Sequence, residues 1–317
     1  MNPTFFRTFG LMAMAFVHAS AAGAEPFLQH GTENGEFTAE LNGLKLWYRV
    51  SGTGPVCLMP SPPWGPSSDL YFHTMKPLEK IFTVVYLDSR GTGRSQRAPS
   101  AQEYTWELLD ADLDALRLHL QQDKVWLMGH SQGGMLAMHY SCRHPDRVNG
   151  LVLLATQATL GAGDDAGLLK RAMRRKDESW FPEALKTFML PPPTTDAEMS
   201  AREKIMLPAY WADPARFEKY ADDFAATSMS AVALKGVMES KRFPFDVTKQ
   251  LTELTAPTLI VAGDKDLFCP PTAARQIHLC LRNSKLLIVE DCGHFPWMEQ
   301  AEEFNIQVPK FLHALGL

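Results

Sequence analysis

The fold of this chain is decided by one stretch, WLMGHSQGGMLAMHY, at residues 126–140. Its first residues form a short apolar run typical of a buried strand, and its second half carries apolar residues at helical spacing. Ser131 stands between the two halves, with a glycine two residues away on each side. The pattern predicts a sharp strand-to-helix turn that projects the serine beyond the sheet, where Gly129 and Gly133 relieve crowding.

Short apolar runs alternate with helical patterns along most of the chain. We expect strands in PVCLMP, FTVVYLD, KVWLMG, VNGLVLLA, PTLIVAG and KLLIVED. We expect helices in SSDLYFHTMKPLEK, TWELLDADLDALRLHL, GGMLAMHYSCRH, PPTAARQIHLCLR and EQAEEFNIQVPKFLHAL. This alternation predicts an α/β fold whose mostly parallel sheet is flanked by helices on both faces. The Asn42–Gly43 pair, between FTAEL and LKLWYRVSG, predicts an antiparallel hairpin at one edge.

The alternation is interrupted once. Residues 158–246 are helical in pattern and rich in Met, Trp and Pro, with three consecutive prolines at 191–193. We interpret this region as a helical cap inserted between two strands. The core is then expected in two pieces, residues 25–157 and 247–317.

The first 24 residues do not fit the core pattern. Arg7 is their only charged residue, an apolar run follows at 9–17, and small residues fill 19–24. A positive start, a short apolar centre and an A-x-A site are typical of a secretory signal peptide, cleaved after Ala24 or after Ala21. The apolar run is too short to span a bilayer. We therefore expect a periplasmic or secreted protein.

Composition limits the classes of partner. The 317 residues are 45% hydrophobic and 21% charged, with a net charge of −5, as in ordinary soluble globular proteins. The basic cluster KRAMRRK at 170–176 is local and is interpreted as a solvated helix face rather than an anion or membrane site. Nothing predicts nucleic-acid binding, and no later stretch reaches the length of a membrane span. We expect a small-molecule or short-peptide substrate; the sequence does not indicate the oligomeric state.

Five cysteines remain in the expected mature chain, so at least one is free or pairs outside the chain. An oxidising compartment permits disulfides. Cys57 and Cys142 are interpreted as core residues of a strand and a helix. A bridge between Cys269 and Cys292 stays open, because their loops are expected to be neighbours. No spacing typical of a metal site occurs.

A serine hydroxyl is a weak nucleophile until a base takes its proton, so a histidine and an acid are expected after Ser131. Two later strands end in polar loops: TLIVAGDKDLF carries Asp264 and Asp266, and IVEDCGHFPW carries His294. Because strand ends at one edge of a parallel sheet converge, these loops can meet Ser131. His294 is the expected base, and His130, beside the serine, is the alternative.

Together these motifs resemble the α/β-hydrolases, and the resemblance covers nearly the whole mature chain. GHSQGG is similar to the family's nucleophile elbow, GDKD to its acid loop and CGHFPWMEQAEEF to its histidine loop. The resemblance implies that Asp266, the second aspartate, is the acid of a triad, with Asp264 as the alternative. YLDSRGTGRS resembles a loop that shapes one wall of the site, which implies a structural role for Asp88 and Arg90.

The loop expected to hold the oxyanion departs from the family. Where the family commonly has His-Gly-x after the third strand, this chain has PSPPWGPSSDLYF. Matching Trp64-Gly65 to the family's x-Gly implies that the backbone N–H groups of Trp64 and Gln132 are the donors. Pro62 and Pro63 have no N–H and cannot donate. The Trp64 ring is expected to line the pocket, with core filling as the alternative.

Three segments resemble the proline-iminopeptidase branch: LDSRGTGRS, LPAYWADPARF and GHFPWMEQAEEF. Those enzymes recognise a free amine with carboxylates of the cap, which implies Glu203, Glu218 and Glu239 as candidates for substrate binding. The chain lacks that branch's His-Gly-Gly-Pro-Gly.

The triad alone does not select the substrate. A carboxylesterase or lactonase acting on small apolar esters is the main alternative to the aminopeptidase. A cofactor-free haloperoxidase and a non-catalytic small-molecule binder are further alternatives. An acyl-enzyme mechanism through Ser131 needs neither a metal nor an organic cofactor.

Overall fold

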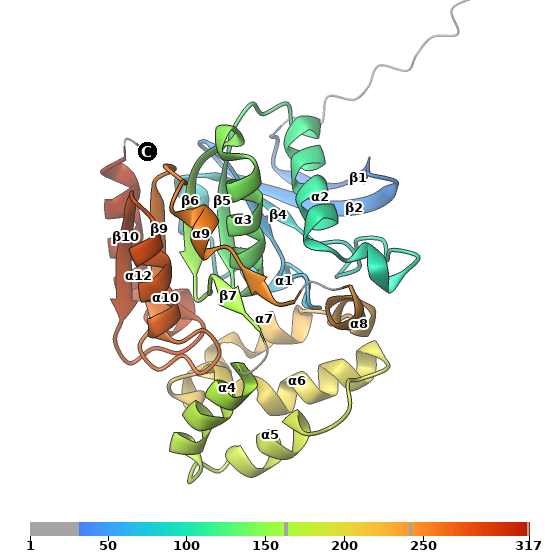
Figure 1. Ribbon diagram of the computed structural model, residues 1–317, viewed down its shortest axis with the longest axis vertical. Helices are drawn as coiled ribbons and strands as arrows, with labels where there is room; N and C mark the ends of the chain where they lie inside the picture. Colours follow the sequence, from blue (N-terminus) through green and yellow to red (C-terminus); the bar gives the residue numbers. More distant parts are fainter. Residues whose placement is uncertain (1–31, 162–163, 241–242, 316) are drawn as a thin grey trace, which may run out of the picture. The chain divides into compact units, whose positions relative to one another are not determined.

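The computed structural model describes residues 32–161, 164–240, 243–315 and 317. An eight-stranded sheet lies at the centre, in the order β1-β2-β4-β3-β5-β6-β9-β10 (Figure 1). Its strands are β1 (Gly35–Leu41), β2 (Leu44–Gly52), β3 (Val56–Pro60), β4 (Thr83–Leu87), β5 (Val125–His130), β6 (Val148–Leu154), β9 (Thr258–Gly263) and β10 (Ser284–Val289).

Strand directions confirm the expected class of sheet. The pairs β1–β2 and β2–β4 are antiparallel, while β4–β3, β3–β5, β5–β6, β6–β9 and β9–β10 are parallel. The hairpin β1–β2 lies at one edge, and its turn uses Asn42 and Gly43 at φ values of 50° and 77°. Asparagine and glycine tolerate positive φ better than other residues, so this pair favours the turn.

Alternating side chains build a core on each face of the sheet. In β5, Leu127 belongs to one core and Met128 to the other, because successive side chains of a strand point to opposite faces. The first core also holds residues of α2 (Trp106–His119), α3 (Gln132–Arg143), α9 (Thr248–Leu251) and α10 (Pro271–Cys280). The second holds residues of α1 (Asp69–Phe72), α11 (Pro296–Glu299) and α12 (Ala301–His313). Helices therefore cover both faces.

The prediction of a single helix over residues 67–80 is wrong. The segment forms only the four-residue α1 and a 3-10 turn at Leu78–Lys80. Ser68 precedes α1 without capping it, because its backbone N–H and its hydroxyl donate to Asp88 at 2.7 and 2.6 Å. Pro77 has no N–H with which to continue a helix. Bonds to a neighbouring loop thus override the local helical pattern.

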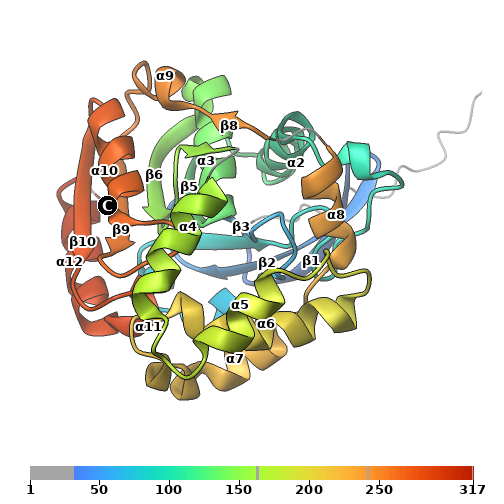
Figure 2. The ribbon, with the colours of Figure 1, turned by 60° about the horizontal axis from the view of Figure 1, so that its bottom comes forward.

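The cap segment, residues 158–246, follows β6 in the chain. It contains α4 (Asp164–Ala172), α5 (Phe181–Phe188), α6 (Asp196–Tyr210), α7 (Ala221–Ala226) and α8 (Ala231–Glu239), with 3-10 turns at Met173–Arg175 and Pro214–Tyr220. A two-stranded ribbon, β7 (Thr159–Leu160) with β8 (Phe245–Asp246), joins its two ends. Figures 1 and 2 show α4 to α7 gathered beyond the carboxyl ends of the parallel strands.

The expected signal peptide, residues 1–24, lies outside the described residues. Among the helices that are described, none is both long and apolar enough to cross a membrane.

Candidate active site

The strand β5 passes into α3 through a single residue, Ser131. Its backbone has φ 54° and ψ −125°, a combination that is costly for residues other than glycine. The carbonyl oxygen of Ser131 accepts from the Thr156 hydroxyl at 2.7 Å and from the backbone N–H of Gly134 at 2.9 Å. These bonds hold a strained turn that places Ser131 in the wall of a large cavity.

The glycines beside the serine are required by space. A Cβ on Gly129 would overlap the backbone of Gly133 and would lie 2.5 Å from the Cα atom of Gly134. A Cβ on Gly133 would lie 2.9 Å from the carbonyl oxygen of Pro60. Real Cβ atoms do not approach backbone atoms so closely. The second contact also shows that the carboxyl end of β3 lies against the serine turn.

His294 and Asp266 meet beyond the carboxyl ends of β10 and β9. Nδ1 of His294 donates to Oδ2 of Asp266 at 2.8 Å, and both side chains are buried. Oδ1 of Asp266 accepts from the backbone N–H groups of Phe268 and Cys269, at 2.8 and 3.0 Å. Because the carboxylate takes the hydrogen bond from Nδ1–H, Nε2 of His294 is left to accept a proton.

Asp264, the alternative acid, makes different contacts. Its side chain is exposed, and its Oδ1 accepts from the backbone N–H of Cys292 at 3.1 Å. Its own backbone N–H donates to the carbonyl of Val289 at 3.0 Å. Asp264 therefore ties the acid loop to the histidine loop, and the geometry favours Asp266 as the partner of His294.

The hydroxyl of Ser131 lies beside a thiol. It hydrogen-bonds with Cys269, whose pKa is raised well above the usual value by burial, so this thiol stays protonated. Within the described ranges no hydrogen bond joins Ser131 to His294. In catalytic sites without bound substrate such bonds are often long or absent.

His130, the alternative base, is engaged on both nitrogens. Nε2 lies 3.1 Å from the carbonyl oxygen of His294, and Nδ1 lies 3.1 Å from the Tyr71 hydroxyl. A carbonyl can only accept, so Nε2 carries the proton and Nδ1 accepts from the tyrosine. Burial, followed by the nearby His294, holds the pKa of His130 well below its usual value. His130 therefore supports the histidine loop and has no nitrogen left for the serine.

The expected oxyanion loop is anchored by a buried carboxylate. Asp88 accepts from Ser68 and from the backbone N–H of Arg94 at 2.8 Å; burial raises its pKa while these bonds lower it. The backbone N–H of Gly65 donates to the carbonyl of Pro62 at 3.3 Å. Among the described residues the N–H of Trp64 donates to no acceptor, so it is available to a bound oxyanion.

Arg90 has a structural role, as the resemblance implies, but its partner is distant in sequence. Its guanidinium makes two hydrogen bonds of 2.7 Å to the carboxylate of Asp112 in α2. It also donates to the backbone carbonyls of Glu103 and Leu108. These bonds fix the loop after β4 to α2.

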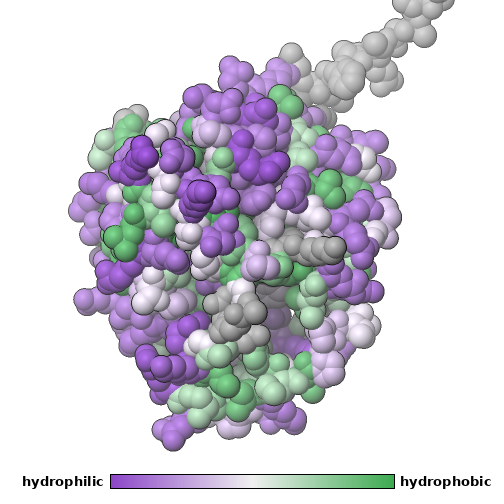
Figure 3. Space-filling model, in the orientation of Figure 1, coloured by the Kyte–Doolittle hydropathy of each residue, from purple (hydrophilic) through white to green (hydrophobic). Residues whose placement is uncertain are grey.

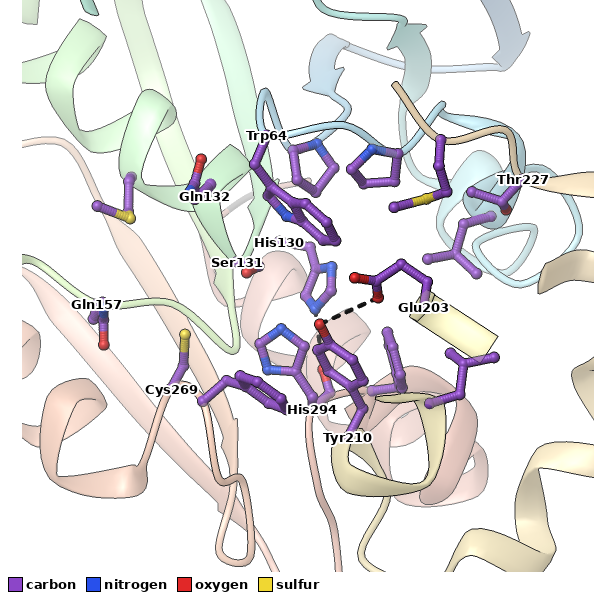
Figure 4. Close-up of a pocket in the computed structure, with 18 of the residues that line it drawn as sticks. Trp64, His130, Ser131, Gln132, Gln157, Glu203, Tyr210, Thr227, Cys269 and His294 are labelled. Carbon is purple, nitrogen blue, oxygen red and sulfur yellow. Dashed lines mark hydrogen bonds between the residues drawn. The ribbon is translucent and has the colours of Figure 1, made fainter. Parts of the chain in front are cut away.

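A cavity of about 980 Å³ lies between the core and the cap segment. The proposed catalytic residues share its wall with mostly apolar neighbours, drawn in part in Figure 4: Ser131, Gln132 and His294, with Pro62, Trp64, Leu70, Tyr71, Met135, Leu160, Leu207, Phe224, Met229, Leu234 and Phe268. Trp64 is half-buried and lines the cavity, which excludes a purely core-filling role.

Glu203 supplies the single carboxylate among the described residues that line this cavity. It lies on α6, and the Tyr210 hydroxyl donates to it at 3.5 Å, a long hydrogen bond. Figure 4 shows its side chain directed into the space bounded by Trp64, His130 and Tyr210. Burial raises the pKa of Glu203 to about 7, because little in this apolar wall stabilises the charge.

The other two candidate carboxylates lie away from the cavity. Glu218 is exposed in the 3-10 turn before α7. Glu239 is exposed at the end of α8, 3.9 Å from Lys235. Neither residue lines the cavity, so the prediction that Glu218 and Glu239 contact the substrate is wrong. Their helical turns point them to solvent, which the sequence pattern alone could not decide.

The outer surface of the cap segment is partly apolar near the cavity. Phe188 lines the cavity and is 43% exposed, and the following Met189 and Leu190 are 74% and 46% exposed. Figure 3 shows apolar side chains gathered at the lower end of the view, over α5. An apolar rim favours apolar substrate groups.

Sequence reasoning missed three residues of the site: Cys269, Tyr210 and Tyr71. Tyr210 lies inside the quoted segment LPAYWADPARF, whereas Cys269 stands one residue beyond TLIVAGDKDLF, three residues after the acid. Tyr71 lies inside the quoted segment PSPPWGPSSDLYF, but nothing in that pattern distinguishes it from an ordinary helix residue.

The five cysteines are all free, so the open bridge between Cys269 and Cys292 is not formed. Asp266, Cys269 and His294 form a group whose potential ligand atoms lie within 4.8 Å of one another. Asp266 and His294 are already bonded to each other, and burial keeps the thiol protonated. This donor set is therefore engaged internally and fits a proton-transfer site better than a metal site.

Comparison with known proteins places this geometry in a family. The sequence profile described as "alpha/beta hydrolase fold" matches residues 56–301. The proline iminopeptidase PfmaB of Pestalotiopsis fici is 28% identical over 82% of this chain and 93% of its own length. The pimeloyl-[acyl-carrier protein] methyl ester esterase of Neisseria meningitidis is 26% identical over 80% of this chain and 91% of its own length.

The solved structure of an alpha/beta fold family hydrolase from Bacillus anthracis has a TM-score of 0.73. It is 20% identical and covers 87% of this chain and 99% of its own length, so it shows the fold. The profile match spans most of the sequence. The two relatives are hydrolases, and the alignment to this chain covers nearly the whole length of each of them. The chain therefore belongs to the alpha/beta hydrolase fold family and is a hydrolase.

Proposed function

We propose that this hydrolase acts through Ser131 as nucleophile, His294 as general base and Asp266 as the residue that orients His294. The support is the bond between Asp266 and Nδ1, together with the strained turn that presents Ser131 to the same cavity. The backbone N–H groups of Trp64 and Gln132 are the proposed oxyanion donors.

In this mechanism Nε2 of His294 takes the proton of the Ser131 hydroxyl as its oxygen attacks the carbonyl carbon. The oxyanion is held by the two backbone donors, and His294 then gives the proton to the leaving amine or alcohol. A water molecule attacks the acyl-enzyme while His294 takes its proton, and Ser131 is regenerated. Asp266 keeps its bond to Nδ1 and stabilises the imidazolium.

We further propose that the substrate carries a free amine and that the enzyme is a proline-iminopeptidase-like aminopeptidase. Glu203 carries this proposal, because its partner is one long hydrogen bond from Tyr210. Lys204 and Arg171 also line the cavity, but no ion pair joins either of them to Glu203 among the described residues. A substrate ammonium would supply a counter-charge and hold the scissile bond near Ser131. The similarity to a proline iminopeptidase over most of the chain supports the same reading.

The second candidate is a carboxylesterase or lactonase that acts on small apolar esters. Its support is the apolar lining of the cavity and the exposed apolar rim at Phe188. One similar relative is an esterase. In this case Glu203, protonated in part near pH 7, would serve as a hydrogen-bond donor or acceptor rather than as a charge.

We also propose that the protein is exported to the periplasm or secreted. The support is the leader-like pattern of residues 1–24, with Arg7 before a short apolar run. Mass spectrometry of the N-terminus of protein recovered from expressing cells is expected to find Glu25 or Ala22 first. A chain that retains Met1 after fractionation with the cytosol would contradict export.

Glu203→Gln is expected to separate the two substrate classes. We expect kcat/KM for a prolyl anilide with a free amine to fall about a hundredfold, because a buried charge-assisted hydrogen bond is lost. A short-chain acyl ester has no amine, so its kcat/KM is expected to change less than about fivefold. Both constants are measured by chromogenic assay on the chain from Glu25, with wild type beside it.

The pH dependence of the two kcat/KM values tests the same role of Glu203 in a second way. The ratio of anilide to ester kcat/KM is expected to rise as pH increases through about 7, because Glu203 ionises there. It is expected to fall again above about pH 8, where an α-amine loses its proton. Ionisations shared by both reactions cancel in the ratio. Ester cleavage without anilide cleavage would refute the aminopeptidase and establish the carboxylesterase.

A further inference from the structure

Glu299 is a buried carboxylate within the motif CGHFPWMEQAEEF, next to the part of the histidine loop at residues 291–295 that carries His294. It ends the short helix α11 and is 7% exposed. Its Oε1 accepts from the backbone N–H groups of Gly293 at 2.9 Å and Phe295 at 3.3 Å. Its Oε2 accepts from the backbone N–H of Ala212 at 2.7 Å. One side chain therefore serves three backbone donors.

The three donors belong to two segments with proposed functional residues. Gly293 and Phe295 flank His294, so both neighbours of the base are bonded to the same carboxylate. Ala212 lies two residues beyond Tyr210, whose hydroxyl donates to Glu203. The backbone N–H of His294 also donates to the carbonyl of Tyr210 at 2.7 Å. The carboxylate of Glu299 thus joins the loop of the proposed base to the cap segment.

The space around these segments is tight. A Cβ on Gly293 would lie 2.8 Å from the backbone nitrogen of Ala212 and would overlap the carbonyl oxygen of Tyr210. Arg175, from the turn after α4, holds the same part of the cap segment by donating to the carbonyls of Trp211 at 2.6 Å and Ala212 at 3.3 Å. A shift of the cap segment here is therefore transmitted to the histidine loop.

Few charges offset the carboxylate of Glu299. Arg216 lies near it from the 3-10 turn before α7, but its guanidinium pairs with Asp291. Cys292, on the histidine loop, also acts on Glu299, and burial keeps that thiol protonated. Burial raises the pKa of Glu299 to about 7, while the three N–H bonds and Arg216 act to lower it.

We propose that Glu299 is a positioning residue that holds His294 in line with Ser131 and couples this base to the cap segment. The proposal rests on the proposed roles of Ser131 and His294. An ionised carboxylate accepts all three N–H bonds with full strength, whereas an amide presents its NH2 group to at least one of the donors, and a carboxylic acid is a weaker acceptor at its protonated oxygen. A neutral group at this position therefore weakens the hold on either the histidine loop or the cap segment.

The test measures how fast a fluorophosphonate labels Ser131, because this probe has no amine and needs only the serine and its base. In Glu299→Gln we expect the labelling rate constant at about pH 8 to fall about tenfold to a hundredfold, as for a misplaced catalytic group. Amide hydrogen exchange at Ala212, Gly293 and Phe295 is expected to accelerate in the same variant.

Asp291→Asn is the matched control. Asp291 lies on the same loop, its side chain is 49% exposed, and its φ of 50° suits asparagine. The change removes surface ion pairs with Arg216 and Lys265 but leaves the bonds of Glu299. Its labelling rate is expected to stay within about threefold of wild type, because exposed ion pairs contribute little.

The pH dependence separates positioning from general stability. Below about pH 7 the wild-type Glu299 gains a proton and then resembles the glutamine of the variant. The ratio of wild-type to Glu299→Gln labelling rates is therefore expected to be largest above pH 7 and to approach one below it. Ionisation of the base affects both proteins and cancels in the ratio. A loss caused by instability alone has no such dependence.

Equal labelling rates in wild type and Glu299→Gln, or a ratio that is the same at every pH, would overturn the proposal. If Glu299→Gln does not fold, Glu299→Asp replaces it: the charge is kept on a shorter side chain, and slower labelling at pH 8 is expected. Equal rates there would likewise overturn the proposal. Wild type that is not labelled at Ser131 would refute the proposed function itself, and the positioning role with it.

Discussion

Replacing Ser131 with alanine is expected to lower kcat by about a millionfold, the size of effect seen when a triad nucleophile is removed. The alanine has no hydroxyl to form an acyl-enzyme, so only the oxyanion donors and substrate binding continue to accelerate hydrolysis. KM is expected to change little, because the missing oxygen makes its bond in the transition state. The measurement is kcat on the better of the anilide and ester substrates.

Ser141→Ala is the control for this loss. Ser141 lies on the same helix α3, is buried, and donates to the carbonyl of Ala137 at 2.7 Å. It does not line the cavity, so its kcat is expected to stay close to that of wild type. Turnover by Ser131→Ala within tenfold of wild type would show that another group attacks the substrate.

Asp266→Asn is expected to lower kcat by about ten thousandfold. The amide still reaches Nδ1, but it favours the wrong tautomer of His294 and cannot stabilise the imidazolium. Asp264→Asn is expected to lower kcat less than about tenfold, because this residue bonds the backbone of Cys292 and not the ring. Steady-state kinetics of the two variants on one substrate measures the difference.

The two aspartates are matched controls for each other, since they lie two residues apart in one loop. A larger loss in Asp264→Asn than in Asp266→Asn would contradict the assignment made from the 2.8 Å bond. Thermal unfolding of both variants separates a loss of catalysis from a loss of folded protein.

Much of the fold could be predicted from local patterns. The parallel strands are continuous apolar runs, the turn at Asn42 and Gly43 has a specific backbone requirement, and the serine turn carries its own glycines. The helix over residues 67–80 could not be predicted correctly. Its pattern is helical, but Ser68 bonds to Asp88, twenty residues away, and a local sequence pattern cannot predict such a long-range contact.

The site divides in the same way. Ser131, Asp266 and His294 each follow a strand within a short motif, so their approach follows from the topology of a parallel sheet. No comparable rule of topology fixes where the carboxylates of the cap segment point. Glu203 faces the cavity while Glu218 and Glu239 face solvent, because the packing of α6 to α8 sets their orientation. Glu299 stood inside a quoted motif, yet its three backbone bonds depend on where the cap segment lies.

The most direct test of Ser131 as the nucleophile is to treat the folded chain with a fluorophosphonate and locate the label by peptide mass spectrometry. We expect one label, on the peptide that contains Ser131, loss of hydrolysis in proportion to labelling, and no label in Ser131→Ala. Hydrolysis that persists in fully labelled protein, or a label on another residue that abolishes activity, would contradict the assignment of Ser131 as the nucleophile.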